Sequence, residues 1–198
     1  MAREIRSAVR MAAATLLLTG IVYPLVVTGL AQALFPRRAN GSLVVVGGRV
    51  VGSAVIGQRF TDPAYFQGRP SAAGTEGYDA MASGGSNLGP TSRALRDRVA
   101  ADVARLRLEN PTAGAPVPVA LVTASASGLD PHLSPVAARW EAPRVAAARG
   151  VPLAVVERML DARIERPTLG FLGAPRVNVL LLNLDLDRRL GKPGRRAR

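Results

Sequence analysis

The sequence has no cysteine and only one histidine, His132. Without cysteine the chain can form neither a disulfide nor a thiolate metal site, and one histidine cannot make an imidazole-rich site. The acidic residues are not grouped as carboxylate ligands would be. A phosphate-binding loop is also missing, because Gly191-Lys192 lacks the preceding glycine spacing of that motif. We therefore expect no metal and no cofactor bound by this chain.

Charged residues are absent from Met11 to Phe35, a run of 25 residues that follows three arginines. As a helix that rises about 1.5 Å per residue, the run would be roughly 37 Å long, enough to cross a hydrocarbon core of about 30 Å. The rest of the chain contains no second candidate of this kind. We predict a cytoplasmic N-terminus over residues 1–10, a transmembrane helix over residues 11–35, and one domain after it.

A cleaved signal peptide is the alternative for the same segment. Ala31-Gln32-Ala33 has the small-x-small pattern of a cleavage site, and cleavage there would release a secreted binding module. The apolar part of a signal peptide is only about 7–15 residues long. The length of the run therefore favours an uncleaved anchor.

The net charge of +12 would suggest a nucleic-acid-binding protein. The excess is concentrated at the C-terminus, where residues 188–198 contain six basic side chains and no acid. Residues 36–187 contain 17 basic and 13 acidic side chains, which is an ordinary surface. We therefore predict no nucleic-acid binding, and a basic, disordered tail over residues 188–198.

Local patterns predict the first part of the domain. Residues 43–51 predict a β-hairpin, because Gly47-Gly48 can supply the positive φ of a tight turn. Residues 91–109 predict an amphipathic helix, since apolar residues recur every three or four positions and Asn110-Pro111 ends the pattern. Between them, residues 57–90 show no sustained period, and an irregular segment of this length is usually functional.

The second part alternates between apolar runs and helix signals. Residues 117–122 and 176–186 have the apolar character of strands. Ser134-Pro135 begins a short helix, residues 143–149 add another turn or two, and residues 152–160 form a further helix. We therefore predict an α/β or α+β domain on a single N-terminal transmembrane helix.

One set of residues suggests catalysis. Ser86, Asp130 and His132 follow the Ser…Asp…His order of α/β-hydrolases, which would make the chain a membrane-tethered serine hydrolase. Leu88 stands where the nucleophile elbow needs glycine. Only Pro131 separates Asp130 from His132, a turn-like placement that is poor for one orienting the other. We keep the hydrolase as the alternative and favour loop residues bonded to backbone.

Several long motifs follow one another in a fixed order. They are Gly57-Gln58-Arg59-Phe60-Thr61-Asp62-Pro63, Tyr65-Phe66-Gln67-Gly68-Arg69-Pro70-Ser71, Ser83 to Pro90, Val122 to His132, and Thr168 to Gly173 leading to Arg176-Val177-Asn178-Val179-Leu180. With the N-terminal span, they resemble the C subunit of the bacterial Kdp potassium-transporting P-type ATPase. The resemblance covers the chain to about Leu186.

This resemblance implies a non-catalytic subunit of an ATP-driven, high-affinity potassium uptake complex in the bacterial inner membrane. Its partners would be a channel-like potassium-translocating subunit, an ATP-hydrolysing P-type subunit and membrane lipid. ATP and potassium would belong to the complex, since this chain lacks the Asp-Lys-Thr-Gly motif of the pump subunit. The domain would be extracytoplasmic. The family is described as a catalytic chaperone that raises the pump's ATP affinity. Because ATP is cytoplasmic, we favour assembly and stabilisation.

Candidate interface residues come from the span and from the irregular loops. Small residues let helices approach closely in lipid, and aromatic residues are common anchors of interfaces. The candidates are Gly20, Thr28, Gly29, Phe60, Tyr65, Phe66, Ser86, Asn87, Asp130 and His132. For the three aromatic residues, burial in the domain's own core is the competing interpretation.

Overall fold

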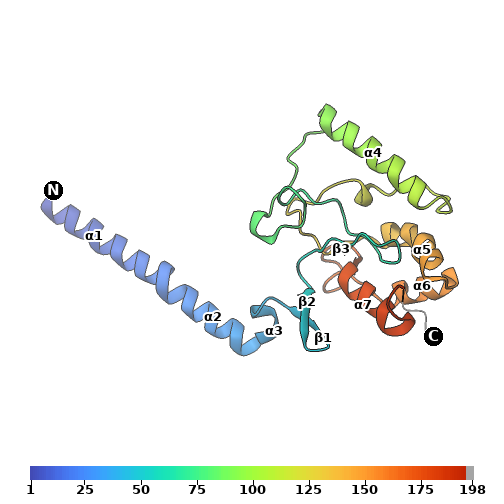
Figure 1. The fold of residues 1–198 in the computed structure, drawn as a ribbon. Helices are drawn as coiled ribbons and strands as arrows, with labels where there is room; N and C mark the ends of the chain where they lie inside the picture. Colours follow the sequence, from blue (N-terminus) through green and yellow to red (C-terminus); the bar gives the residue numbers. More distant parts are fainter. Residues whose placement is uncertain (195–198) are drawn as a thin grey trace. The chain divides into compact units, whose positions relative to one another are not determined.

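The computed structural model describes residues 1–194 of the chain (Figure 1). It consists of two compact units, Met1–Ser53 and a second that begins at Ala54. The first contains the long N-terminal helix and a β-hairpin. The second contains the remaining helices and a small sheet, and it holds the hydrophobic core.

The N-terminal helix is continuous from Ala2 to Leu34 and is, in the part of the chain that the structure describes, the one helix long and apolar enough to span a membrane. It comprises α1 (Ala2–Leu17), a π-helical turn η1 (Leu18–Val22) and α2 (Tyr23–Leu34). The π-turn lies just before Pro24, which has no N–H to give to the α-helical ladder. Its widened pattern is seen where Tyr23 N donates to Leu18 O, five residues back.

A short helix and a β-hairpin follow the long helix in the first unit. Helix α3 (Pro36–Ala39) leads to the antiparallel strands β1 (Leu43–Val46) and β2 (Arg49–Ser53). Gly47 and Gly48 connect the strands with φ values of 58° and 78°, so the predicted tight hairpin is confirmed. The side-chain amides of Gln32 and Asn40 bond each other at 3.1 and 3.3 Å, which ties the end of α2 to the start of the hairpin.

The second unit is a mixed helical domain with a small sheet. Its three short strands are antiparallel in the order β3-β5-β4. The elements in chain order are η2 (Ala80–Ala82), α4 (Arg93–Glu109), η3 (Val119–Leu121), β3 (His132–Leu133), α5 (Pro135–Arg149), α6 (Leu153–Asp161), β4 (Ile164–Glu165), β5 (Arg176–Asn178) and α7 (Val179–Leu190). This agrees with the predicted α+β class.

The core forms where α5, α6 and α7 pack with β5. Its fully buried side chains include Leu160, Val145, Val177, Leu182 and Leu186. The irregular segment before α4 also contributes Phe66, which is 0% exposed. The core therefore includes part of that segment as well as the helices.

One predicted strand is wrong, and a second is confirmed only over its first three residues. Residues 117–122 contain η3, in which Leu121 N donates to Pro118 O and Val122 N donates to Val119 O. Leu121 and Val122 are consecutive and both buried, which a half-buried strand does not allow. The predicted strand over residues 176–186 ends at Asn178, where α7 begins.

The start of α7 has a clear local cause. The Asn178 side chain accepts a hydrogen bond from Leu181 N at 3.1 Å, which caps the helix. Val179, Leu182 and Leu186 are then buried at helical spacing. In the sequence, the neighbouring apolar residues hide this helical spacing.

The remaining predictions differ in their boundaries. The helix over residues 91–109 is confirmed as α4, capped by Ser92. The two short helices predicted near Ser134 and over 143–149 are one helix, α5, which continues through Pro143 because its flanking residues are buried. Helix α7 includes Arg188 and Arg189, so the predicted tail begins later than residue 188. Residues 195–198 of that tail lie outside the described residues.

Candidate functional site

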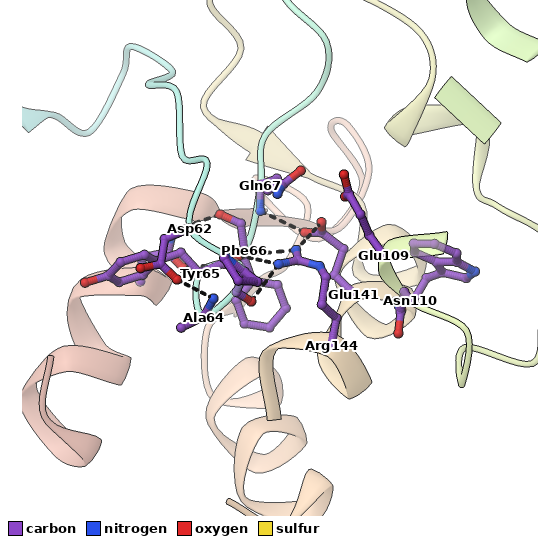
Figure 2. Close-up of polar contacts among 12 residues, drawn as sticks. Asp62, Ala64, Tyr65, Phe66, Gln67, Glu109, Asn110, Glu141 and Arg144 are labelled. Carbon is purple, nitrogen blue, oxygen red and sulfur yellow. Dashed lines mark hydrogen bonds and ion pairs between the residues drawn. The ribbon is translucent and has the colours of Figure 1, made fainter. Parts of the chain in front are cut away.

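The segment 62–67 is fastened to α5 by a buried ion pair (Figure 2). Arg144 Nη2 donates to Glu141 Oε1 at 2.7 Å, and the same guanidinium donates to the carbonyls of Pro63 and Tyr65 at 2.7 and 3.2 Å. Glu141 Oε2 accepts from Gln67 N at 2.9 Å. The pair thus satisfies backbone groups that an irregular buried segment would otherwise leave unpaired.

Burial raises the pKa of Glu141 to about 7, because its carboxylate is completely removed from water. The hydrogen bonds from Arg144 and Gln67 oppose this shift, and the charge of Glu109 adds to it. Glu141 is therefore a carboxyl group whose protonation depends on pH near neutrality, inside the main support of the 62–67 segment.

A second support joins α5 to α7 through Tyr65. The Tyr65 hydroxyl donates to Asp187 Oδ2 at 2.9 Å, and Arg149 Nη2 donates to Asp187 Oδ1 at 3.0 Å. The guanidinium of Arg149 also lies 4.9 Å from the centre of the Tyr65 ring. Burial and the bond to Asp187 raise the pKa of Tyr65 to about 12. These contacts position the ring on its own domain.

Arg69 joins the irregular segment to the loop 123–132. Its guanidinium donates to the carbonyls of Thr123 and Ala124 at 3.3 and 3.2 Å, and it pairs with Asp130 at 3.3 Å. Asp130 Oδ1 also accepts from His132 N at 3.0 Å. Hydrogen bonding from the His132 side chain, with a smaller contribution from Arg69, lowers the pKa of Asp130.

The serine- and glycine-rich motifs also contact one another. Ser71 Oγ donates to Gly128 O at 2.6 Å, and Ser83 Oγ donates to Ser127 O at 3.0 Å. Gly128 has a φ of 66°, and a Cβ there would lie 2.6 Å from Gly84 O. Only glycine fits this crossing of three loops. The motifs that are far apart in the sequence are therefore one hydrogen-bonded cluster.

A cavity of about 430 Å³ lies between the irregular segment and α4. Its charged lining is mixed in sign, and the arginines pair with acids: Arg59 with Glu76 at 3.7 Å, and Arg105 with Glu109 at 3.0 Å. Over the described residues, no group of three or more His, Asp and Glu side chains is placed to hold a metal ion. The cavity has no excess of one charge with which to select an anion or a cation.

The structure places the predicted interface residues in different environments. Among the aromatic residues, Phe66 is core, and Phe60 and Tyr65 are half-buried with ring centres 5.8 Å apart. Burial in the domain's own core, the competing interpretation, therefore holds for Phe66. Gly20, Thr28 and Gly29 are exposed on the long helix, and Asn87 is exposed with a φ of 51°.

The predicted catalytic trio is only partly assembled. Asp130 Oδ1 lies 3.3 Å from His132 Nδ1, so these two side chains do meet, against our expectation. Among the described residues, no hydrogen bond joins Ser86 to either of them, and Asp130 is shared with Arg69. Nothing in this geometry favours the serine hydrolase.

Five polar residues that support the segment 62–67 and α7 were missed by sequence reasoning. They are Glu141, Arg144, Arg149, Asn183 and Asp187. A signal exists for Glu141, because it lies among Ala137, Ala138 and Val145 on the buried face of α5. A charge at a core position of a helix predicts a buried partner.

These features define a class: a mixed α+β domain, held together by its own polar loops and attached to one helix with the length and composition of a membrane span. The chain matches the KdpC family, described as the K⁺-transporting ATPase c chain, over residues 5–188. It therefore belongs to the KdpC family.

Similar proteins cover both units of the chain. The potassium-transporting ATPase KdpC subunit of Myxococcus xanthus is 65% identical over 186 residues, which is 93% of this chain and 88% of the relative. The KdpC subunit of Nitratidesulfovibrio vulgaris is 59% identical and spans 87% of this chain and 89% of its own. That of Rhodopseudomonas palustris is 54% identical over 94% of this chain and 98% of its own.

Proposed function

We propose that this chain is the accessory C subunit of an ATP-driven potassium pump, and that it assembles and stabilises the complex. The observation that carries the proposal is the family match over residues 5–188, which includes the apolar helix as well as the domain. The uncharged run over residues 11–35 is longer than the apolar part of a cleaved leader, which has about 7–15 residues. The helix is thus a permanent anchor in this proposal.

The internal use of polar groups supports a role in assembly. The polar side chains of the motifs form hydrogen bonds with this domain's own loops. Those of Arg69 and Ser71 are examples. The catalytic residues of the pump would then lie on another chain, and the partners would be its channel-like and ATP-hydrolysing subunits. A rigid, preformed surface loses little entropy when it binds such partners.

The proposed topology is single-pass in the bacterial inner membrane, with a cytoplasmic N-terminus and the domain outside. A domain on that side cannot touch cytoplasmic ATP. If the chain raises the ATP affinity of the pump subunit, as a catalytic chaperone would, it does so through the partner subunits. The apparent affinity of the purified pump for ATP, measured with and without this chain, tests that role.

Copurification tests the assembly role. The tagged chain, expressed with the neighbouring reading frames and extracted in a mild detergent, should bring down two larger membrane subunits. A matched variant with residues 11–34 replaced by an unrelated apolar helix tells whether the span or the domain carries the contact. Recovery of the chain alone, while the larger subunits stay associated with each other, would contradict the proposal.

The absence of cysteine makes the topology directly testable. Leu108 is 83% exposed on α4, and Ser7 is exposed near the N-terminus. A membrane-impermeant maleimide should label Leu108→Cys in intact spheroplasts and Ser7→Cys only after lysis. The opposite pattern would reverse the proposed orientation.

A further inference from the structure

The loop between β4 and β5 is uncharged over nine consecutive residues, 167–175. Arg166 and Arg176 stand at its two ends. The strands that carry it pair in antiparallel register, Glu165 opposite Arg176. The loop is therefore an apolar tip on a short two-stranded stem, with a cation at each side of its base.

Three large apolar side chains of this tip face solvent. Leu169 is 80% exposed, Phe171 75% and Leu172 52%. Elsewhere in the described part of the second unit, strongly exposed apolar residues such as Leu108 and Val136 stand singly. Scattered single residues need no explanation, whereas three within four positions do.

The backbone of the tip is already hydrogen-bonded within itself. Thr168 N and Leu172 N each donate to the carbonyl of the other at 2.9 Å. Gly170 N donates to Pro167 O at 3.0 Å, and Phe171 N donates to Thr168 O at 3.3 Å. Such a turn can leave water without exposing these N–H groups unpaired, which is the condition for entering an apolar phase.

The tip also holds strain that packing within the domain does not explain. Leu169 has a φ of 55°, a left-handed conformation that is uncommon for a leucine. The turn nevertheless directs this side chain outward and does not bury it in the core. Strained residues of this kind concentrate at functional surfaces.

We propose that the tip formed by Leu169, Phe171 and Leu172 inserts into the interfacial layer of the bilayer that holds the span. Its apolar side chains would enter the acyl boundary, and Arg166 and Arg176 would meet the phosphates of the lipid headgroups. Arg176 keeps its bond to Glu165, at 3.0 Å, within the stem. The proposal rests on the uncleaved anchor of the proposed function.

The observations favour insertion of the tip into lipid over docking on a protein partner. A stable protein interface buries about 800 Å² on each partner, and a four-residue tip with glycine, alanine and proline beside it is narrow for that purpose. A bilayer requires no matching surface. Because the domain is tethered to the same membrane by its own chain, even a weak insertion is populated.

Spin labels test the proposal on the full chain, which has no native cysteine. Phe171→Cys carries the label, and Leu108→Cys, at 83% exposure on α4, is the matched control. In vesicles of phosphatidylethanolamine and phosphatidylglycerol, the label at 171 should collide several-fold more with oxygen than with a nickel chelate, relative to the label at 108. Equal ratios at the two positions would overturn the proposal.

Two further measurements separate the other outcomes. Vesicles are washed with alkaline carbonate: release of the chain would mean that the anchor fails, whereas a retained chain with a water-exposed label at 171 refutes the insertion alone. If the label becomes shielded from both reagents only when the larger subunits are present, the tip docks on protein and the lipid proposal is wrong. Arg166→Glu should reduce insertion in the anionic vesicles if the headgroup contact holds.

Discussion

The side chain of Asn183 on α7 forms hydrogen bonds with both the N–H and the carbonyl of Phe66, as a neighbouring strand would. Its Nδ2 donates to Phe66 O and its Oδ1 accepts from Phe66 N, both at 2.9 Å. The two residues are 1% and 0% exposed, so water does not compete for these bonds. One side-chain amide therefore satisfies both polar groups of a core residue that belongs to no strand or helix.

Replacement of Asn183 should destabilise the domain strongly. In Asn183→Ala both buried backbone groups of Phe66 lose their partner, at a cost of about 1–3 kcal/mol each, so we expect a loss of about 2–6 kcal/mol. Urea unfolding of the detergent-solubilised chain, followed by the fluorescence of buried Trp140, measures it. Thr112→Ala, at an exposed position, should change the stability by less than about 0.5 kcal/mol. Equal midpoints for the two variants would refute the interpretation.

Two glycines with nearly the same φ should respond differently to alanine. Gly128 and Gly114 have φ values of 66° and 61°. At Gly128 a Cβ would lie 2.6 Å from Gly84 O, whereas at Gly114 the nearest atom is 4.0 Å away. We expect Gly114→Ala to cost about 1 kcal/mol from strain alone and Gly128→Ala about 3 kcal/mol or more. Trp140 fluorescence during thermal unfolding compares them, and similar losses would show that the loop crossing can relax.

The stability of the domain should fall as pH rises from about 5 to about 8. The pKa of Glu141 is about 7 in the folded chain, above its ordinary value near 4.5, because of burial. The folded state therefore binds more protons than the unfolded state in this window, and the stabilisation that is full at low pH is lost as Glu141 ionises. The full effect is about 3 kcal/mol.

Glu141→Gln should remove this dependence. Asp130, with a lowered pKa, and Tyr65 and Tyr78, at about 12, titrate outside the window, so they do not mask the effect. Urea midpoints at several pH values for the two proteins provide the measurement. A wild-type midpoint that rises between pH 5 and 8, or a slope that survives in the variant, would contradict the assignment to Glu141.

Arg69 should control the order of the loop 123–132. Arg69→Ala removes two carbonyl contacts and the Asp130 pair, so we expect a loss of about 1–2 kcal/mol and faster protease cleavage in this loop. Arg59→Ala is the matched control, because that side chain is 60% exposed and contacts Glu76, at 3.1 Å to its carbonyl and 3.7 Å to its carboxylate. Unchanged cleavage in Arg69→Ala would show that other contacts suffice.

Elements with an unambiguous sequence pattern were predictable, and those whose pattern fits both a strand and a helix were not. The hairpin follows from Gly47-Gly48, and α4 from its cap and its apolar repeat. The predicted strand over residues 176–186 is correct only as far as Asn178, because an apolar run does not distinguish a buried strand from a buried helix. In the structure, the hydrogen bond from Leu181 N to the Asn178 side chain marks the point where the strand ends and the helix begins.

The site was predictable as a set of motifs but not as a network. The contacts of Ser71 with Gly128 and of Arg69 with Asp130 join residues of motifs quoted from the sequence, yet they span 57 and 61 positions. The side chains that support the segment 62–67 lie outside those motifs, on helices whose packing a single sequence does not reveal. Tertiary context, not local propensity, decided their roles.

The amide pair of Gln32 and Asn40 has a mechanical consequence. The pair joins α2 to the residues before β1, and Ser53 Oγ at the end of β2 donates to Gly41 O at 2.6 Å. The end of the helix and the hairpin are therefore linked at both strands. We therefore expect a rotation of this helix about its long axis to turn the two strands with it.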